Sequence, residues 1–309
     1  MQEHLFTVGI CATNDRGSMP RLLGNITAEK LPAGCFISDM VIVVSGSTDG
    51  TERIAESFRP AFSRTLIVED SRRGKAEAVN RIMSCMRGNY LILVNGDALP
   101  ELGALSRIME SLSTGEYSVA CALPVPADSE CSRIVGCLTS FLWSLHNSTM
   151  ERLQQGSENI HLTDEMIGLS AAAVSPLPEG TVNDGAYIAV RAQHYGHKTG
   201  FCRDARVTVS VPAGLAGLLR QRRRILYGHM LVKEMTGSAP GTVEFKFKER
   251  PVLCAGILFS QLRAEPRNLL LLPLLVSVEM LAMFGALRDR KRRFQMHTIW
   301  KRVKNAAWR

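Results

Sequence analysis

The chain has 309 residues, of which 46% are hydrophobic and 21% are charged, and its formal net charge is +8. This length allows a large core and one large or two moderate domains, and the lack of internal repeats excludes a repeat architecture. The 8 cysteines are scattered without a CxxC pair, so we interpret them as buried reduced thiols, which excludes a zinc site and a disulfide framework. The N-terminus has no basic segment followed by an apolar one, so nothing in it predicts secretion.

The N-terminal part of the chain predicts alternating strands and helices. Apolar runs with the character of strands end on polar clusters, and helical segments follow them. The predicted order is strand Leu5–Ala12, polar cluster Thr13–Asp15, helix Met19–Ala28, strand Met40–Val44, polar cluster Ser45–Thr51 and helix Thr51–Phe58. This β-α-β-α order favours a largely parallel sheet with right-handed crossovers, which places the polar strand ends at one edge.

A third apolar run, Tyr90–Val94, ends abruptly on Asn95, Gly96 and Asp97. Such a run predicts a buried strand leading into a tight turn, with the Asp97 carboxylate at the carboxyl end of the strand. Open α/β sheets bind ligands at that end. Three polar clusters are therefore expected to converge on one crevice, although asparagine, glycine and aspartate are also ordinary turn residues.

The order and spacing of six stretches resemble the family 2 glycosyltransferases, which have the GT-A fold. The stretches are Val8–Asp15 (VGICATND), Val43–Glu56 (VVSGSTDGTERIAE), Arg72–Met83 (RRGKAEAVNRIM), Tyr90–Leu105 (YLILVNGDALPELGAL), Thr181–Val190 (TVNDGAYIAV) and Gln221–Ile225 (QRRRI). The resemblance implies an α/β, Rossmann-like fold, with a mixed, mainly parallel sheet flanked by helices and a C-terminal helical segment. It also implies a donor that is a sugar linked to a nucleotide diphosphate.

Several polar residues occupy positions where the family binds its donor. The resemblance gives this role to Thr13, Asp15, Ser45, Asp49, Lys75, Asn95, Asp97, Gln221 and Arg224. For Asp49 the alternative is an N-terminal cap of the following helix, and for Lys75 it is a solvated charge before a helix. The family usually has an acidic pair where this chain has Val44 and Ser45, so its nucleobase contacts must differ.

Asp97 is the expected metal ligand. The family motif is Asp-x-Asp, whose last carboxylate binds Mg²⁺ or Mn²⁺ on the donor diphosphate, and this chain replaces the first carboxylate with Asn95. One carboxylate suffices for Mg²⁺, which keeps its waters and substrate oxygens.

Gln221 and Arg224 resemble the family's Gln-x-x-Arg-Trp element, with Ile225 in place of the tryptophan, which favours non-processive transfer. At helical spacing Gln221 and Arg224 share a face, so Arg224 is expected to contact the diphosphate. Arg222 and Arg223 point elsewhere and are expected to face membrane or solvent. His229 lies further along the same helix, either beside the acceptor or as a packing residue.

The expected catalytic base departs from the family. Family members carry an acidic pair before a Gly-aromatic turn, and its second member deprotonates the acceptor. Counting back from Gly196 places Asp184 at the first position of the pair and Gly185 at the second. Three interpretations stay open: Asp184 takes over the role of base, the acidic pair is offset in the sequence, or the protein is catalytically impaired. In an active enzyme, aspartate at position 185 should be tolerated.

The C-terminal part combines an apolar stretch, Leu269–Leu287, with a tail from Arg288 that holds nine Lys or Arg residues and one acid, Asp289. This pairing favours an anionic membrane surface over nucleic acid as the partner. The stretch is an interfacial or re-entrant helix, a buried helix or a true span, and Glu279 within it would cost about 2.5 to 3.5 kcal/mol on insertion. The expected location is the cytoplasmic face of the cell membrane, peripheral or with one C-terminal hydrophobic segment.

We therefore expect three regions: a nucleotide-sugar-binding half at 1–120, an acceptor-binding half at 121–215, and a basic, membrane-associating helical segment at 216–309. Trp143, His146 and Met166–Ala173 are candidates for the acceptor walls. The expected function is metal-dependent, inverting transfer of a hexose to a hydroxyl or lipid-linked phosphate acceptor, with Asp184 as the catalytic residue. The alternative is a nucleotide-sugar-binding or membrane-scaffold protein without activity.

Overall fold

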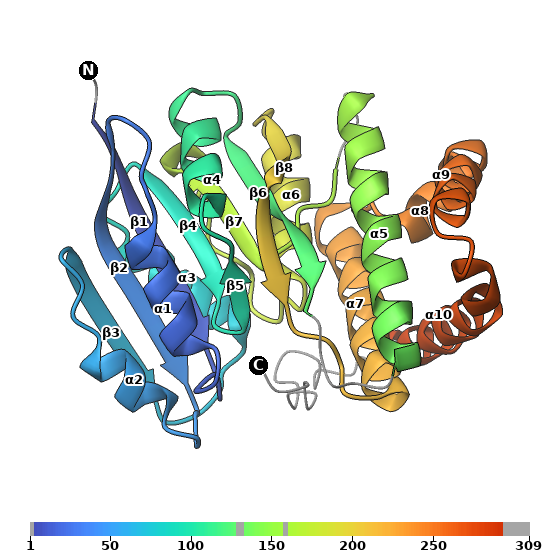
Figure 1. Cartoon of the computed structure of the whole chain (residues 1–309), viewed down its shortest axis with the longest axis horizontal. Coiled ribbons are helices and arrows are strands. Elements are labelled where there is room, and N and C mark those ends of the chain that lie inside the picture. Colours follow the sequence, from blue (N-terminus) through green and yellow to red (C-terminus); the bar gives the residue numbers. More distant parts are fainter. Residues whose placement is uncertain (1–2, 128–132, 157–159, 293–309) are drawn as a thin grey trace.

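A computed structural model describes residues 3–127, 133–156 and 160–292. Its centre is a twisted eight-stranded sheet with the strand order β3-β2-β1-β4-β7-β6-β8-β5 (Figure 1). Helices cover both faces of the sheet, and the C-terminal helices gather beyond one side of it. The sheet and its flanking helices confirm the expected mixed α/β fold.

One half of the sheet is parallel and holds the three strands expected from the sequence. It consists of β1 (His4–Ala12), β2 (Cys35–Ser45), β3 (Ser63–Glu69) and β4 (Tyr90–Asn95). β2 starts before the predicted Met40, because Cys35 pairs with His4 at the start of β1. The sequence reasoning did not predict β3, whose side chains are mostly only half-buried and which pairs with β2 alone in the described chain.

The other half of the sheet mixes strand directions. It consists of β5 (Ala98–Pro100), β6 (Val119–Pro126), β7 (Met166–Ser170) and β8 (Thr199–Val209). β7 runs antiparallel to both β4 and β6, β6 is parallel to β8, and β5 is antiparallel to β8. Because β7 is antiparallel to β4, its first residue lies at the same edge as the carboxyl end of β4.

Alternating side chains of the strands build a core on each face of the sheet. On one face, Phe6, Val8 and Ile10 of β1 pack with α1 (Met19–Ala28) and α4 (Ala104–Ser113). On the other face, Leu91 and Leu93 of β4 pack with residues of α3, α5, α6 and α7. These helices span Lys75–Cys85, Arg133–Gln155, Asp184–His194 and Leu215–Thr236. The short helix α2 is Thr51–Ser57 and η1 is Ala171–Ala173.

The C-terminal helices are α8 (Val243–Glu249), α9 (Pro251–Ala264) and α10 (Asn268–Lys291). α10 packs against α7, with Leu275, Val278, Ala282 and Ala286 buried. Most of the basic tail, 293–309, lies outside the described residues. The expected C-terminal helical segment is therefore present as three helices after α7, which itself packs against the sheet domain.

Candidate active site

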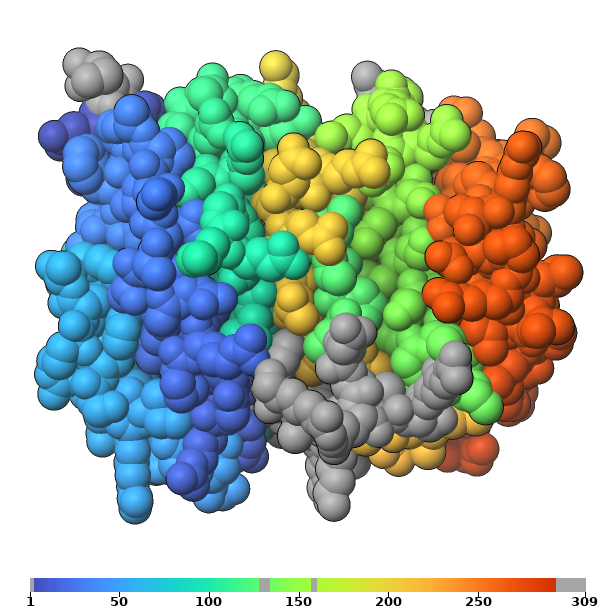
Figure 2. All heavy atoms as spheres, viewed as in Figure 1, coloured from blue at the N-terminus to red at the C-terminus, as the bar shows by residue number. Residues whose placement is uncertain are grey.

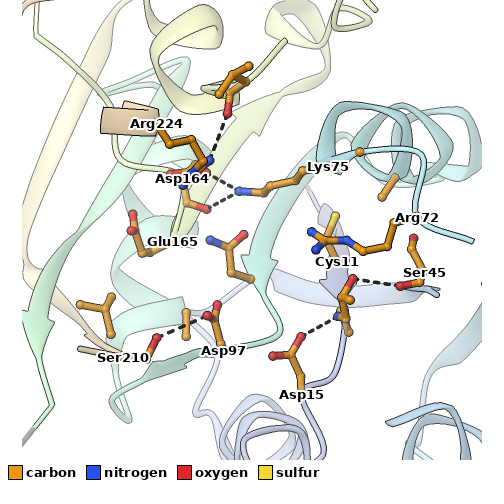
Figure 3. A pocket seen from close by; sticks show the side chains of 18 of the residues that line it. Cys11, Asp15, Ser45, Arg72, Lys75, Asp97, Asp164, Glu165, Ser210 and Arg224 are labelled. Atoms are coloured by element: carbon orange, nitrogen blue, oxygen red, sulfur yellow. Dashed lines mark hydrogen bonds and ion pairs between the residues drawn. The ribbon is translucent and has the colours of Figure 1, made fainter. Parts of the chain in front are cut away.

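A crevice of about 1270 Å³, including its open mouth, lies at the carboxyl ends of the parallel strands (Figure 3). Residues from both halves of the sheet, from α5 and from α7 line it. Of the residues predicted from the sequence, it brings together Thr13, Asp15, Ser45, Lys75, Asn95, Asp97, Gln221 and Arg224. The three polar strand ends thus converge as expected, because parallel strands with right-handed crossovers all end at one edge.

The loop after β1 holds one wall of the crevice. The carboxylate of Asp15 accepts the Thr13 backbone N–H at 2.7 Å, and the Thr13 hydroxyl donates to the Ser45 carbonyl at 3.0 Å. Asn14 has a positive φ of 53°, and its side chain accepts the Thr48 N–H at 2.8 Å. These bonds tie the loop after β1 to the loop after β2, so Thr13, Asp15 and Ser45 present fixed polar groups to a ligand.

Asp49 does not line the crevice. Its carboxylate accepts hydrogen bonds from the backbone N–H and hydroxyl of Thr51, at 3.0 and 2.6 Å, and from the Arg16 N–H at 3.0 Å. Thr51 is the first residue of α2, so Asp49 satisfies donors that the helix leaves unpaired at its start. The contacts are those of the capping alternative.

The turn after β4 carries Asn95 and Asp97. A Cβ at Gly96 would lie 2.5 Å from the Asp15 carboxylate and 3.0 Å from Ala12, so only glycine allows the two loops to approach so closely. The Asp97 carboxylate accepts the Ser210 hydroxyl at 3.4 Å. Among the described residues, no group of three or more His, Cys, Asp or Glu side chains forms a metal cage. One carboxylate beside an amide oxygen still fits Mg²⁺ or Mn²⁺, since such ions take further oxygens from a diphosphate.

Opposite Asp97, a lysine and two aspartates form a compact cluster. Lys75, the first residue of α3, forms ion pairs with Asp164 and, at 3.0 Å, with Asp184. The Asp164 side chain is 27% exposed and lines the crevice, whereas Asp184, at 5%, lies beneath it. Sequence reasoning predicted Asp184 as the catalytic residue and missed Asp164, which lines the crevice.

The two aspartates have opposite pKa shifts. Burial and the adjacent negative charge of Asp164 raise the pKa of Asp184 to about 7. Burial opposes ionisation of Asp164 too, but the Lys75 ammonium and a hydrogen bond with Asp184 lower the pKa of Asp164 below its usual range. Asp164 is therefore ionised at neutral pH, whereas Asp184 takes up a proton as the pH falls through about 7.

Gly185 is close-packed against the segment that carries Asp164. A Cβ at Gly185 would lie 2.5 Å from the Leu162 carbonyl oxygen and 3.0 Å from the backbone nitrogen of Asp164. The expectation that aspartate is tolerated at position 185 is therefore wrong on steric grounds, since backbone atoms occupy the space. Position 185, where the family has its second carboxylate, therefore has no room for a side chain, because the backbone next to Asp164 fills that space.

On α7, Gln221 and Arg224 line the crevice as expected. Figure 3 shows Arg224 next to Asp164. Arg222 and Arg223 do point away from the crevice. The Arg222 side chain is only 18% exposed, against the expectation that it faces membrane or solvent, whereas the Arg223 side chain is 39% exposed. Arg222 makes a bidentate ion pair with Glu279, at 2.6 and 3.0 Å, and Arg223 pairs with Asp289. These two arginines attach α10 to α7, and Arg222 neutralises the one acid in the apolar stretch.

The crevice has further polar residues that the sequence reasoning missed, namely Arg72, Asp164, Glu165 and Ser210. The acidic pair Asp164-Glu165 immediately precedes β7, which the sequence analysis considered as an acceptor wall. Met166–Ser170 instead lies in the interior of the sheet, and only the residues before it reach the crevice. A strand antiparallel to β4 begins at the ligand edge, so the acidic pair at the start of β7 was the sequence feature that could have indicated these site residues.

Burial raises the pKa of the Cys11 thiol at the crevice to about 12, which keeps it protonated.

Trp143 of α5 lines the crevice, and behind it lies a row of buried imidazoles. The ring centroids of successive residues lie close together: 5.5 Å from Trp143 to His146, 5.4 Å from His146 to His161 and 5.0 Å from His161 to His229. Each pair of rings meets edge to face. His229 Nδ1 is 2.6 Å from the Glu244 carboxylate. Burial lowers the pKa of His146 to about 4. Neither His146 nor His229 lines the crevice, so they pack within the structure.

A family model for glycosyl transferase family 2 matches residues 7–176, more than half of the chain. The chain belongs to glycosyl transferase family 2. Two curated relatives are similar to parts of it. A dolichyl-phosphate beta-glucosyltransferase of Dictyostelium discoideum is 28% identical over 28% of this chain and 28% of its own length. A PGL/p-HBAD biosynthesis glycosyltransferase of Mycobacterium bovis is 28% identical over 46% of this chain and 52% of its own length. The matches thus span about half or less of these relatives.

Two solved structures share the fold. A mannosyltransferase from Pyrobaculum calidifontis, in complex with GDP-Man and Mn²⁺, is 20% identical, covers 97% of this chain and 86% of its own, and has a TM-score of 0.57. Glucosyl-3-phosphoglycerate synthase from Mycobacterium tuberculosis, with Mn²⁺, UDP-Glc and phosphoglyceric acid, is 15% identical, covers 76% and 80%, and has a TM-score of 0.54. These likenesses confirm the GT-A fold.

Proposed function

We propose that this chain is an inverting glycosyltransferase that moves a sugar from a nucleotide diphosphate donor to a hydroxyl or lipid-linked phosphate acceptor. One observation carries the proposal: a single crevice holds polar strand ends suited to a nucleotide, the Asp97 carboxylate, an arginine and a charged aspartate. The two solved relatives described above are complexes with a nucleotide sugar and Mn²⁺. Residues 1–120 would bind the donor and 121–215 the acceptor, a division that stays a prediction.

In this proposal the donor lies along the ends of the parallel strands. Thr13, Asp15 and Ser45 bind the nucleoside, and Arg224, with its planar always-charged fork, binds the diphosphate. Asp97 and Asn95 would hold Mg²⁺ or Mn²⁺, which supplies charge neutralisation of the leaving diphosphate when bound. Lys75 already has two carboxylate partners, so its role shifts from binding the donor to orienting the acids.

Asp164, supported by Asp184, is the proposed base. The acceptor O–H attacks the anomeric carbon, the bond from that carbon to the diphosphate oxygen breaks, and the proton passes to Asp164. Asp164 is ionised and reaches the crevice, whereas Asp184 is buried beneath it and hydrogen-bonds to it. The predicted catalytic role of Asp184 therefore becomes a shared one, through its neighbour. Positioned proton transfer of this kind contributes about 10² to 10⁴ in rate.

Three measurements test this function. Calorimetry with UDP and GDP should show Mn²⁺-dependent binding, and Asp97→Asn should weaken it about tenfold or more, while circular dichroism shows an intact fold. Sugar transfer or donor hydrolysis should fall about 10²-fold in Asp164→Asn without loss of donor binding. Donor binding with no turnover for any donor, unchanged in Asp164→Asn, would support the alternative of a non-catalytic binding protein.

The outer face of α10 supports an anionic membrane surface as a partner. We define this face by its exposed apolar residues, Leu269, Leu270, Val276, Met280, Leu281, Phe284 and Leu287. It lies opposite the side that packs on α7, so α10 is apolar on both sides. α10 is the one helix in the described chain that is long and apolar enough to cross a membrane by length and composition. Basic residues lie at both ends of it: Arg263 and Arg267 precede α10, its last turn holds Arg288, Arg290 and Lys291, and Arg292 follows.

Point variants test the membrane proposal better than truncation, because removing α10 would expose the core on α7. Leu270→Glu with Phe284→Glu should release the protein from sedimenting anionic vesicles. Val68→Glu with Leu102→Glu, at exposed apolar positions on the sheet domain, should not. Binding should weaken with salt, since charges are screened over about 8 Å at physiological ionic strength. Equal sedimentation of both double variants would contradict the proposal and its implied location at the cytoplasmic face of the membrane.

A further inference from the structure

A second hollow lies beside the crevice, between α5, the ends of β6 and β8, and α9. Figure 2 looks onto this face, where β8 and α5 lie next to each other with α9 beyond. Trp143 lines both the hollow and the crevice, so the two spaces share one wall. The two spaces are therefore neighbours on either side of Trp143.

α5 presents a polar stripe to this hollow. The stripe consists of Ser140, Ser144, Asn147, Ser148 and Glu151, which are spaced so that they share one helix face. A smaller adjoining hollow shares Ser148 and Glu151 and continues to Gln155. From Trp143 to Gln155 the helix rises about 18 Å, which makes a trough long enough for a short chain of sugars.

The floor of the trough is built from hydroxyl and amide groups. Gln261 of α9 donates to the Ser148 hydroxyl at 2.8 Å and accepts from the Ser144 hydroxyl. Asn147 donates to the Pro124 carbonyl at 3.1 Å, but its side-chain oxygen is buried and has no hydrogen-bond partner among the described residues. The hydroxyl and amide groups of Ser140, Ser144 and Ser148 and of Gln261 are donors and acceptors of the kind that pair with sugar hydroxyls.

The charges around the trough are balanced. Arg203 pairs with Glu151 at 3.4 Å, and Arg206 pairs with Glu101 at 3.3 Å. A site for a polyanion would need a cluster of unpaired arginine or lysine. Both arginines of the larger hollow are paired, Asp204 also lines it, and the smaller hollow adds a single arginine, Arg152. A trough lined by paired charges, hydroxyls, amides and an indole ring instead suits a neutral ligand that carries many hydroxyl groups.

We propose that the trough along α5 binds a neutral oligosaccharide that forms the body of the acceptor, with its reacting end next to Trp143. This inference rests on the proposed function and specifies its acceptor class. The acceptor hydroxyl would enter the crevice near Asp164, while the preceding sugars lie on the Ser140 to Gln155 stripe. Because the trough lies outside the donor space, saccharide binding does not depend on the nucleotide.

The test uses neutral trisaccharides of glucose, mannose, galactose and N-acetylglucosamine, with their monosaccharides, in saturation-transfer NMR titrations of the full chain. Excess UDP or GDP with Mn²⁺ occupies the donor space. At least one trisaccharide should bind tenfold tighter than its monosaccharide. Ser140→Trp, which places an indole in the trough, should weaken that binding at least tenfold. Ser84→Trp is the matched control, because Ser84 is an exposed serine on α3, away from the trough.

Gln261→Ala, which removes one amide from the floor, is a second variant in case Ser140→Trp does not fold, and it should weaken binding several-fold. The proposal is overturned if no trisaccharide binds better than its monosaccharide or if both tryptophan variants bind alike. Tighter binding of a sulfated oligosaccharide than of its neutral form also overturns it. Nucleotide binding, measured separately by calorimetry, distinguishes failure of the trough from failure of the proposed function.

Discussion

Gly185 offers a sharp test of the active-site geometry, because it packs against the backbone that carries Asp164. Gly185→Ala would place a Cβ 2.5 Å from the Leu162 carbonyl oxygen, whereas carbon and oxygen atoms normally lie about 3.5 Å apart. The segment from Leu162 to Asp164 must therefore move by about 1 Å. Overpacking of this kind costs about 1 to 3 kcal/mol.

Gly24→Ala is the matched control. Both glycines lie in helices, and a Cβ at Gly24 meets nothing within 4 Å. Alanine stabilises a helix interior by up to about 1 kcal/mol relative to glycine, so Gly24→Ala should raise the free energy of unfolding by up to that amount. Gly185→Ala should lower it by up to about 2 to 3 kcal/mol, because a steric cost of about 1 to 3 kcal/mol outweighs the gain from alanine.

Urea denaturation followed by circular dichroism measures the two free energies, and sugar transfer or donor hydrolysis measures activity. A displacement of about 1 Å at a catalytic group costs about 10²-fold in rate, so Gly185→Ala should lose about that much turnover and Gly24→Ala none. If Gly185→Ala is as stable and as active as Gly24→Ala, then the close packing is wrong and Asp164 is not the group that the glycine positions.

Two further predictions use charged pairs. Arg224→Lys should lower transfer about tenfold or more, because a point charge cannot replace a bidentate contact with the diphosphate. Arg222→Lys should lower stability more than turnover, since Arg222 pairs with Glu279. Equal losses of turnover in the two variants would mean that the wrong helix face was assigned. Burial and the charge of Asp164 raise the pKa of Asp184 to about 7, so the folded chain keeps a proton that the unfolded chain releases near pH 4. This proton should make the free energy of unfolding fall by up to about 1.4 kcal/mol per pH unit between about pH 4 and 7. The lowered pKa of Asp164 lies below that window, whereas burial raises the pKa of Glu165 to about 8 and lowers that of His146 to about 4, so both groups also contribute within it, with opposite signs. Asp184→Asn should therefore remove the share of the slope that belongs to Asp184 in urea denaturation across pH, and a slope equal to that of the unchanged chain would contradict the assigned pKa.

Much of the donor side could be predicted from the sequence because its signals are local. The strand ends at Thr13, Ser45 and Asn95 follow apolar runs that are buried on both faces, and parallel topology brings such ends together. Helix α1 has the predicted bounds, Met19–Ala28, since its apolar residues recur at helical spacing. β3 was missed because most of its side chains are only half-buried, which leaves no continuous apolar run.

The acceptor side could not be predicted in the same way, because it depends on which strands become neighbours. Asp164 lies at the site only because β7 pairs antiparallel with β4, and strand pairing across 70 residues leaves no local pattern. The ion pairs of Arg222 and Arg223 likewise need α10 packed on α7. Sequence reasoning had no means to find these contacts, so it assigned the two arginines to membrane or solvent.

The sequence by itself determined the family, the α/β fold and the convergence of the polar strand ends on one crevice, because periodicity, turn residues and motif spacing are written along the chain. The tertiary structure alone decided which carboxylate faces the crevice, why position 185 has no side chain, and what Glu279 pairs with. The physical reason is that packing and pKa values depend on distances between residues far apart in sequence. Lys75, Asp164 and Asp184 come from three separate segments, and only the folded chain brings their charges within contact.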